Sequence, residues 1–185
     1  MEDIVFGIDI GTTKICALVG AVRNRELQII GLGVQPSSGM RKGMIVDVPS
    51  ATMALARAVH ASPATRLVGI ECYEGQGATG DSAADAAYVD ALMQRVHAVV
   101  RDCAAQGLFT GTEVLVTAGG SALYDLVATR LRPTLDLPVQ ALLRSGCYLT
   151  HDHGNYQRLQ RAVDTRLGCA EGESARKGNE GGEER

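Results

Sequence analysis

The pattern of apolar residues changes at about residue 50, and this change limits the fold more than any other feature of the chain. Before it, three β-rich runs follow one another, DIVFGIDIG, KICALVGAV and LQIIGLGV, and they are separated only by TT and by the charged turn RNRE. Turns this short connect antiparallel strands, because parallel strands need a longer crossover. We therefore expect the first 34 residues to form a three-stranded antiparallel meander.

After residue 50, patterns typical of helices and of strands alternate. A loop with Pro36, Gly39 and Gly43 leads into a short apolar strand, and Ser50 then suits the N-cap of a helix over 50–62. Further helices are expected over 84–105 and 122–131, and strands over 66–75, 112–121 and 139–152. These strands are continuously apolar, which is typical of parallel sheets. The fold class expected is α/β, a meander followed by part of a parallel βα assembly.

The composition excludes several classes of partner. The 185 residues are 45% hydrophobic and carry a net charge of -3 without a basic patch, so we expect no nucleic-acid partner. Without an apolar run of about 20 residues or a basic leader, we expect no membrane span and a cytoplasmic location. The five cysteines are irregularly spaced, which favours reduced and mostly buried thiols; they are Cys16, Cys72, Cys103, Cys147 and Cys169.

The stretch DIGTTKICALVG, which begins at Asp9, combines a strand, a glycine turn and a second strand. Gly11 would let the backbone approach an anion, Thr12 and Thr13 supply hydroxyl donors, Lys14 supplies a positive charge, and Asp9 could hold a magnesium ion through water. The alternative is a tight hairpin with threonines on its rim. The residues alone leave both interpretations open.

Residues 4 to 48, including the segment GMRKGMIVD, resemble the N-terminus of the FtsA family of actin-like bacterial cell-division proteins. The resemblance implies an actin-like or RNase H-like fragment in which Asp9, Gly11, Thr12, Thr13 and Lys14 form the first phosphate loop of a Mg-ATP site. It also implies filament formation and tethering of the tubulin-like division ring to the membrane. No second phosphate loop, adenosine pocket or amphipathic membrane helix follows residue 48, so we expect ATP binding to be weak.

Two later stretches carry candidate chemistry. In TAGGSALYD, Gly119, Gly120 and Ser121 lie between a strand and a helix, where backbone N–H groups can hold a phosphate; the alternative is a βα turn in which Ser121 only caps the helix. In LLRSGCYLTHDHGNY, the imidazoles of His151 and His153 flank Asp152. This set suits a divalent metal such as zinc or manganese, although polar loop residues would give the same pattern.

From about residue 50 to 156 the chain is similar to the second half of the barrel of D-threonine aldolase, a pyridoxal-phosphate enzyme of the alanine-racemase fold type. The resemblance implies metal-assisted retro-aldol cleavage of β-hydroxy amino acids. Gly119, Gly120 and Ser121 would hold the cofactor phosphate, and the site would be lined by Tyr73, Arg144, Cys147 and Tyr148. The Schiff-base lysine has no counterpart, because the only lysines, Lys14, Lys42 and Lys177, lie outside the matched segment.

We therefore interpret the chain as a chimera with three parts: an FtsA-like fragment over 1–48, an aldolase-like partial βα barrel over 49–166 and a disordered polar tail over 167–185. The first functional hypothesis is a non-catalytic protein that retains binding of a phosphate ligand, either ATP or pyridoxal phosphate. The second is an interaction or regulatory protein that acts on bacterial division or on another partner. The third is an aldolase completed by another chain. An unclosed sheet exposes its edges, so a homodimer or another protein partner is expected there.

Overall fold

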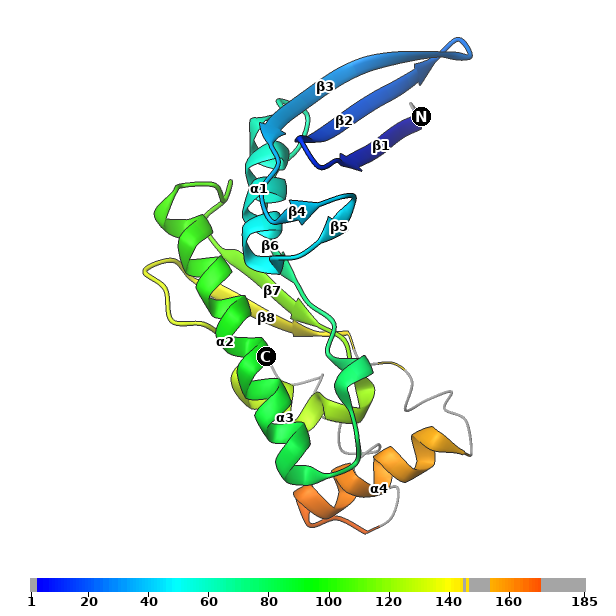
Figure 1. Ribbon diagram of the computed structural model, residues 1–185, viewed down its shortest axis with the longest axis vertical. Helices are drawn as coiled ribbons and strands as arrows, with labels where there is room; N and C mark the ends of the chain where they lie inside the picture. Colours follow the sequence, from blue (N-terminus) through cyan, green and yellow to red (C-terminus); the bar gives the residue numbers. More distant parts are fainter. Residues whose placement is uncertain (1–2, 145, 147–153, 171–185) are drawn as a thin grey trace. The chain divides into compact units, whose positions relative to one another are not determined.

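The computed structural model describes residues 3–144, 146 and 154–170 (Figure 1). It confirms the expected fold class, since a three-stranded antiparallel meander is followed by a three-stranded parallel sheet with helices. The chain divides into two compact units, which we describe separately. Unit 1 takes the residues up to Gly69 together with Ala98–Val114 and Leu135–Pro138, and unit 2 takes Ile70–His97, Leu115–Thr134 and the residues from Val139 onward.

The meander of unit 1 consists of β1 (Asp3–Ile10), β2 (Lys14–Arg23) and β3 (Glu26–Pro36), with β2 in the centre. Both pairings are antiparallel, and a β-bulge interrupts the β2–β3 register at Val19/Gly20. Asn24 and Arg25 form the second turn with φ of 53° and 66°, the left-handed conformation that lets a two-residue turn match the twist of its strands. The three strands predicted from the sequence are confirmed.

A small hairpin and the first helix follow the meander. The hairpin joins β4 (Met40–Arg41) to β5 (Met44–Ile45), so the predicted apolar strand is only two residues long. Helix α1 (Val48–Ala61) begins earlier than expected, and the expectation that Ser50 is its N-cap is wrong. Asp47 is the N-cap, and its carboxylate accepts hydrogen bonds from the Ser50 N–H and, at 2.6 Å, from the Ser50 hydroxyl. Pro49 suits this first turn because it needs no N–H partner there.

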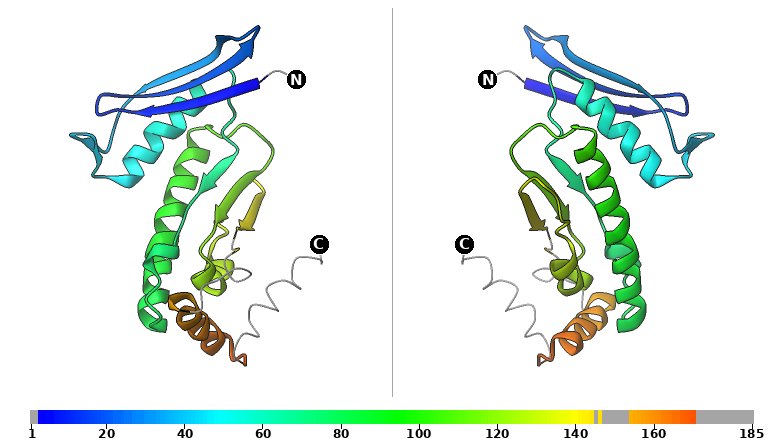
Figure 2. Two further views of the ribbon diagram at one scale, coloured as in Figure 1. Left: turned by 90° about the vertical axis from the view of Figure 1, so that its right-hand side faces the viewer. Right: turned by 90° about the vertical axis from the view of Figure 1, so that its left-hand side faces the viewer.

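Helix α1 covers one face of the meander, over β2 and β3 (Figure 2). Alanines on the helix, among them Ala54 and Ala58, pack against the fully buried Ile15 and Ala17 of β2. Gly33 lies so close to the helix that a Cβ at this position would overlap the carbonyl oxygen of Ala58. Small residues on both elements therefore allow the helix backbone to approach the sheet closely at this point.

Unit 1 also takes in residues 98–114, which include the end of α2 (Ser82–Ala105), and the short segment 135–138. The Cys103 thiol lies 3.5 Å from the Met53 sulfur of α1, and both side chains are buried. The His60 ring bonds the carbonyl of Leu108 at 2.8 Å. Residues distant in sequence thus complete the core around α1.

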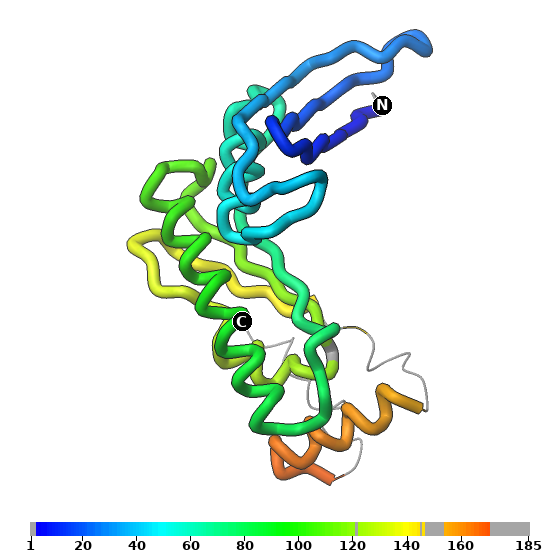
Figure 3. The backbone as a smooth tube through the Cα atoms, in the orientation of Figure 1, coloured from blue at the N-terminus to red at the C-terminus, as the bar shows by residue number. Residues whose placement is uncertain are grey.

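The parallel sheet has the order β6 (Gly69–Glu71), β7 (Val114–Ala118), β8 (Val139–Leu143), so each strand lies beside the one before it in sequence. The sheet's hydrogen bonding continues past the strand ends, where the Cys72 N–H donates to Thr117 and the Arg144 N–H donates to Ala118. Helix α3 (Tyr124–Arg130) follows β7, and the order of elements can be traced along the backbone in Figure 3. The predicted helices of this half and the positions of its three strands are confirmed. However, β8 ends at Leu143, and most of the rest of the predicted strand over 139–152 lies outside the described residues.

Helix α4 (Asn155–Leu167) was not among the elements predicted from the sequence. It ends at Gly168, whose φ of 64° is the left-handed conformation typical of a helix C-terminus. Across the ranges 3–144 and 154–170, every helix is too short or too polar to cross a lipid bilayer. The predicted division into 1–48, 49–166 and 167–185 stays a prediction, and most of its tail, 171–185, lies outside the described residues.

Candidate functional site

The first candidate turn, between β1 and β2, is an exposed hairpin end. The Gly11 N–H donates to the Lys14 carbonyl at 3.0 Å, and the Thr13 carbonyl accepts a bond from the Ser37 N–H at 3.0 Å. The Thr12 hydroxyl oxygen accepts a bond from the Gly43 N–H at 3.0 Å, which leaves its hydrogen available to a ligand. The turn thus offers hydroxyl groups and the Lys14 ammonium, while its glycine amide already bonds within the chain. The predicted binding of Mg-ATP by this turn stays a prediction, and so does the predicted contact of Asp9 with a magnesium ion.

The second candidate turn, after β7, already holds a carboxylate. The Gly119 N–H donates to one carboxylate oxygen of Glu74 at 3.3 Å, and the Gly120 N–H donates to the other. Glu74 is fully buried, and a Cβ at Gly120 would overlap its carboxylate. The two amides therefore converge on an anion, but that anion belongs to the chain. A phosphate would have to displace Glu74 to reach them.

Arg144 joins the ends of the three parallel strands beside this turn. Its guanidinium donates to the Thr117 hydroxyl at 3.0 Å and to the Cys72 carbonyl at 3.1 Å, and it forms an ion pair with Glu71 at 2.9 Å. A Cβ at Gly119 would lie 3.3 Å from the guanidinium. The predicted site residue Arg144 and the predicted glycine turn are therefore neighbours, and the arginine contributes a positive charge beside Gly119.

The Cys72 thiol near the turn is a poor candidate for nucleophilic chemistry at neutral pH. Burial raises the pKa of Cys72 to about 11, and the Glu74 carboxylate adds to this increase, so the thiol stays protonated and is a weak nucleophile. Tyr73 lies on the loop after β6 and is 59% exposed. Its predicted role in lining a site stays a prediction.

The remaining predicted site residues lie outside the described part of the chain. These are Cys147, Tyr148 and the metal candidates His151, Asp152 and His153. Ser121 differs from them, because its backbone is described although its side chain is not. Among the described residues, no group of three or more histidine, cysteine or acidic side chains could hold a metal ion. The metal prediction therefore stays a prediction.

Sequence reasoning missed a buried ionic network in unit 2. Arg166 on α4 bonds both carboxylate oxygens of Asp125 at 2.7 and 2.9 Å and lies 3.5 Å from Asp85. Burial alone would lower the pKa of Arg166, but the hydrogen bonds and charge of Asp125, together with the charge of Asp85, raise it. Asp85 also accepts bonds from the backbone and hydroxyl of Thr79, both at 2.8 Å. This network anchors helices and offers no open ligand position.

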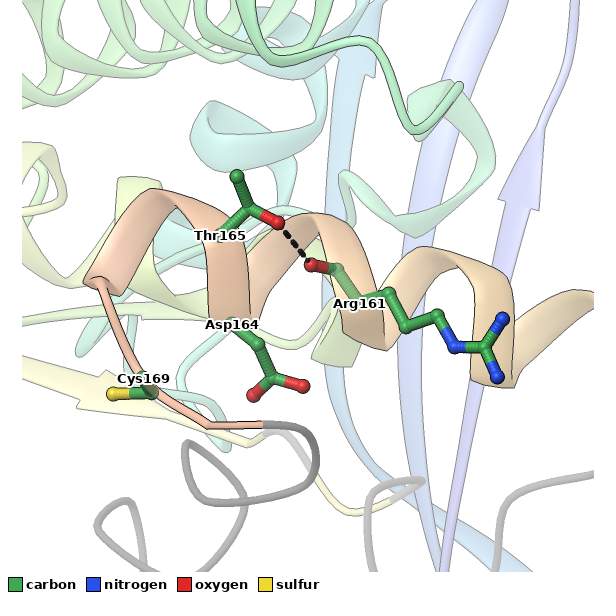
Figure 4. A pocket seen from close by; sticks show the side chains of 4 residues that line it. All are labelled: Arg161, Asp164, Thr165 and Cys169. Atoms are coloured by element: carbon green, nitrogen blue, oxygen red, sulfur yellow. Dashed lines mark hydrogen bonds between the residues drawn. The ribbon is translucent and has the colours of Figure 1, made fainter.

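A shallow hollow lies along α4 (Figure 4). It is lined by Arg161, Asp164, Thr165 and Cys169, and the Thr165 hydroxyl donates to the Arg161 carbonyl at 2.8 Å. All four residues come from one helix and its end, so the hollow lacks the converging groups from several elements that mark a built ligand site.

Part of the chain is similar to a family of bacterial division proteins. It is 41% identical to the cell division protein FtsA of Pseudomonas aeruginosa over 56 residues, which is 30% of this chain and 13% of that protein. It is 44% identical to FtsA of Escherichia coli K12 over 57 residues, which is 30% of this chain and 14% of that protein. It is 36% identical to FtsA of Bacillus subtilis over 68 residues, which is 37% of this chain and 15% of that protein. The chain thus spans about one seventh of the length of these relatives.

No protein-family model matches this chain. The expectation of an FtsA-like segment is confirmed by the partial similarity to the three relatives. The resemblance to D-threonine aldolase and the interpretation as a chimera stay predictions.

Proposed function

We propose that this chain is a non-catalytic binding protein that acts on the bacterial division apparatus. The observation that carries the proposal is an exposed apolar segment over residues 44–48, which runs from β5 of the hairpin to the first residue of α1. Four side chains in five residues are more than half exposed: Met44, Ile45, Val46 and Val48. Exposed apolar residues that gather in one segment are typical of a protein-binding surface.

The hairpin is held in one conformation without the help of a partner. The N–H groups of Val46 and Asp47 both donate to the Gly39 carbonyl, at 2.8 and 3.1 Å, and Gly43 donates to Thr12 of the first turn. Binding by a segment that is already ordered loses less conformational entropy than binding by a flexible one. The backbone bonds therefore support a binding role for these exposed side chains.

Expression in Escherichia coli tests this function, because that organism has an FtsA protein similar to part of the chain. If the chain occupies a surface that the division apparatus needs, expressing cells should divide less often and become longer. Val46→Asp should restore normal length, since it places a charge in the apolar segment. Val68→Asp is the matched control, because Val68 is a comparably exposed valine outside the hairpin. Normal cell length at confirmed expression would contradict the division role, and equal lengthening by Val46→Asp would contradict the hairpin as its site.

A second candidate function is phosphate binding at Gly119–Ser121, as expected for the cofactor phosphate of an aldolase-like fragment. The observation that favours it is the convergence of the Gly119 and Gly120 amides on the carboxylate of Glu74. Backbone amides that stabilise a carboxylate have the geometry needed for a phosphate as well. Glu74 would then compete with the ligand for the same donors.

Thermal melts in inorganic phosphate and in pyridoxal phosphate test this candidate. Glu74→Ala removes the competing carboxylate, so either ligand should raise the melting temperature of this variant more than that of the unchanged chain. Glu71→Ala is the control, because it removes an exposed acid near Arg144 and leaves the two amides covered. The candidate fails if neither ligand shifts the melt of Glu74→Ala. A parallel melt in Mg-ATP with Lys14→Ala tests the first turn.

A further inference from the structure

Strand β1 forms an open edge of the meander. It pairs with β2 on one side, from Asp3 with Val22 to Ile10 with Ile15, and it is the outermost strand in the order β1-β2-β3. Its outer edge pairs with no strand in the described part of the chain (Figure 1). All eight residues of β1 are exposed. An open edge presents backbone N–H and C=O groups that can pair with another strand.

The side chains of β1 make this edge strongly apolar. Every second residue is a large apolar one, and these four are 56%, 50%, 41% and 42% exposed: Ile4, Phe6, Ile8 and Ile10. Their cross-strand partners on β2 include the fully buried Ile15 and Ala17, which face α1. The four exposed side chains of β1 thus lie on the same face of the sheet that α1 covers at β2. They form the uncovered margin of that face, at the edge of the sheet.

The sequence of β1 is nearly symmetric about Gly7, which indicates what covers the edge. The large apolar residues lie one and three positions to either side of this glycine. An antiparallel pairing of two β1 strands centred on Gly7 places Phe6 opposite Ile8 and Ile4 opposite Ile10. Pairs of this kind stabilise a sheet. A partner of unrelated sequence would gain nothing from this symmetry, whereas a second copy related by a two-fold axis matches it.

The charges of β1 select the same register. With Gly7 at the centre, Asp9 faces Val5 and Asp3 lies beyond the apolar pairs. A register centred on Phe6 would place Asp3 opposite Asp9, and like charges directly opposite each other destabilise a sheet. A register centred on Ile8 keeps the charges apart but removes Ile4 from the paired region. Only the Gly7 register pairs the full apolar row without a like-charge contact.

We propose that two copies of this chain associate through antiparallel pairing of their β1 strands about Gly7, which joins the two meanders into one continuous sheet. This goes beyond the proposed division role, because it concerns a different surface and requires only the purified chain. Sedimentation velocity should show a concentration-dependent dimer. A chain that is monomeric at every concentration, or that forms open-ended aggregates, would overturn the proposal.

A cysteine cross-link tests the register. Gly7→Cys is compatible with the fold, since a Cβ at Gly7 meets no atom within 4 Å. Opposed residues of an antiparallel pair have Cα atoms about 5 Å apart, which suits a disulfide. Mild oxidation should therefore link the two introduced thiols, as identified by mass spectrometry. Val5→Cys is the control, because its two copies would lie about 13 Å apart. Cross-linking by Val5→Cys and not by Gly7→Cys would contradict the register.

Charge complementation gives a second, independent test. Phe6→Lys and Ile8→Glu should each abolish the dimer, because each places two charges in the apolar row. Both positions are exposed, so the fold of the single chain should tolerate the changes. When the two variants are mixed, the introduced lysine and glutamate face each other and a heterodimer should form. A mixture that stays monomeric would overturn the pairing of positions 6 and 8.

Discussion

At the scale of single residues, Gly33 controls how closely α1 approaches the meander. A Cβ at this position would overlap the Ala58 carbonyl oxygen, which belongs to the helix backbone and cannot rotate away. Gly33→Ala should therefore lower the free energy of unfolding by about 1–3 kcal/mol, the usual cost of overpacking. Gly111→Ala should have little effect, since the nearest atom there would be at 3.6 Å. Urea unfolding of both variants measures the difference, and equal stability would contradict the tight helix–sheet contact.

The buried thiol of Cys103 should make stability depend on alkaline pH. Burial, with a smaller effect of the Asp102 carboxylate, raises the pKa of Cys103 from 9.0 to about 11. Between these values the unfolded chain loses the thiol proton while the folded chain keeps it, so stability falls as pH rises from 9 to 11. Cys103→Ala should remove the part of the decrease in the free energy of unfolding between pH 9 and 11 that comes from this thiol. Val100→Ala, a buried neighbour without a titrating group, should lower stability equally below and within this range.

Local chemistry predicted some residues of the candidate site and missed others. The glycine turn at Gly119 and Gly120 was predicted from free backbone amides, and the structure places those amides together. The sequence could not show that Glu74, 45 residues earlier, fills them, because that contact depends on the parallel pairing of β6 with β7. Ser50 was expected as a helix cap because serine suits that position, yet Asp47 suits it equally and precedes Pro49.

At the scale of elements, α4 depends on one arginine. The Arg166 side chain is 9% exposed, and its guanidinium pairs with the Asp125 and Asp85 carboxylates, whose side chains are 4% and 1% exposed. Arg166→Ala leaves two buried carboxylates without this partner and should lower the free energy of unfolding by about 3–5 kcal/mol. Arg95→Ala changes an exposed arginine of α2 and should lie within about 0.5 kcal/mol of the unchanged chain. A small effect of Arg166→Ala in urea unfolding would contradict the anchoring role.

The same helix shows why some elements could not be predicted. Strands β1 to β3 have dense apolar runs and clear turns, so their pattern stands out. Helix α4 is largely polar, and its buried apolar residues are only Leu159 and Val163. Their four-residue spacing and the glycine at 168 are signals of a helix, but two apolar residues are too few to distinguish it from a loop. Its stability comes from ionic contacts, which a hydrophobic pattern does not report.

At the scale of the whole chain, the change of sequence pattern at residue 50 is not a boundary between the two compact units. The change of pattern at residue 50 predicted the order of elements correctly. However, unit 1 also includes residues 98–114 of the later half, through contacts such as Met53 with Cys103 and His60 with Leu108. Sequence patterns report local structure, whereas these contacts join residues about 50 positions apart. The packing of α1 against residues 98–114 could therefore not be predicted from the sequence and is known only from the structure.

This division predicts which segments unfold together. If residues 98–105 belong to the core around α1, Gly33→Ala should increase amide hydrogen exchange in α1, in β2 and in the last two turns of α2. Arg166→Ala should instead increase exchange in α3 and α4, because Asp125 and Arg166 lie in unit 2. Peptide-resolved mass spectrometry measures both patterns. Protection lost across the whole chain in both variants would show one cooperative unit, while an unchanged end of α2 in Gly33→Ala would contradict its place in the first core.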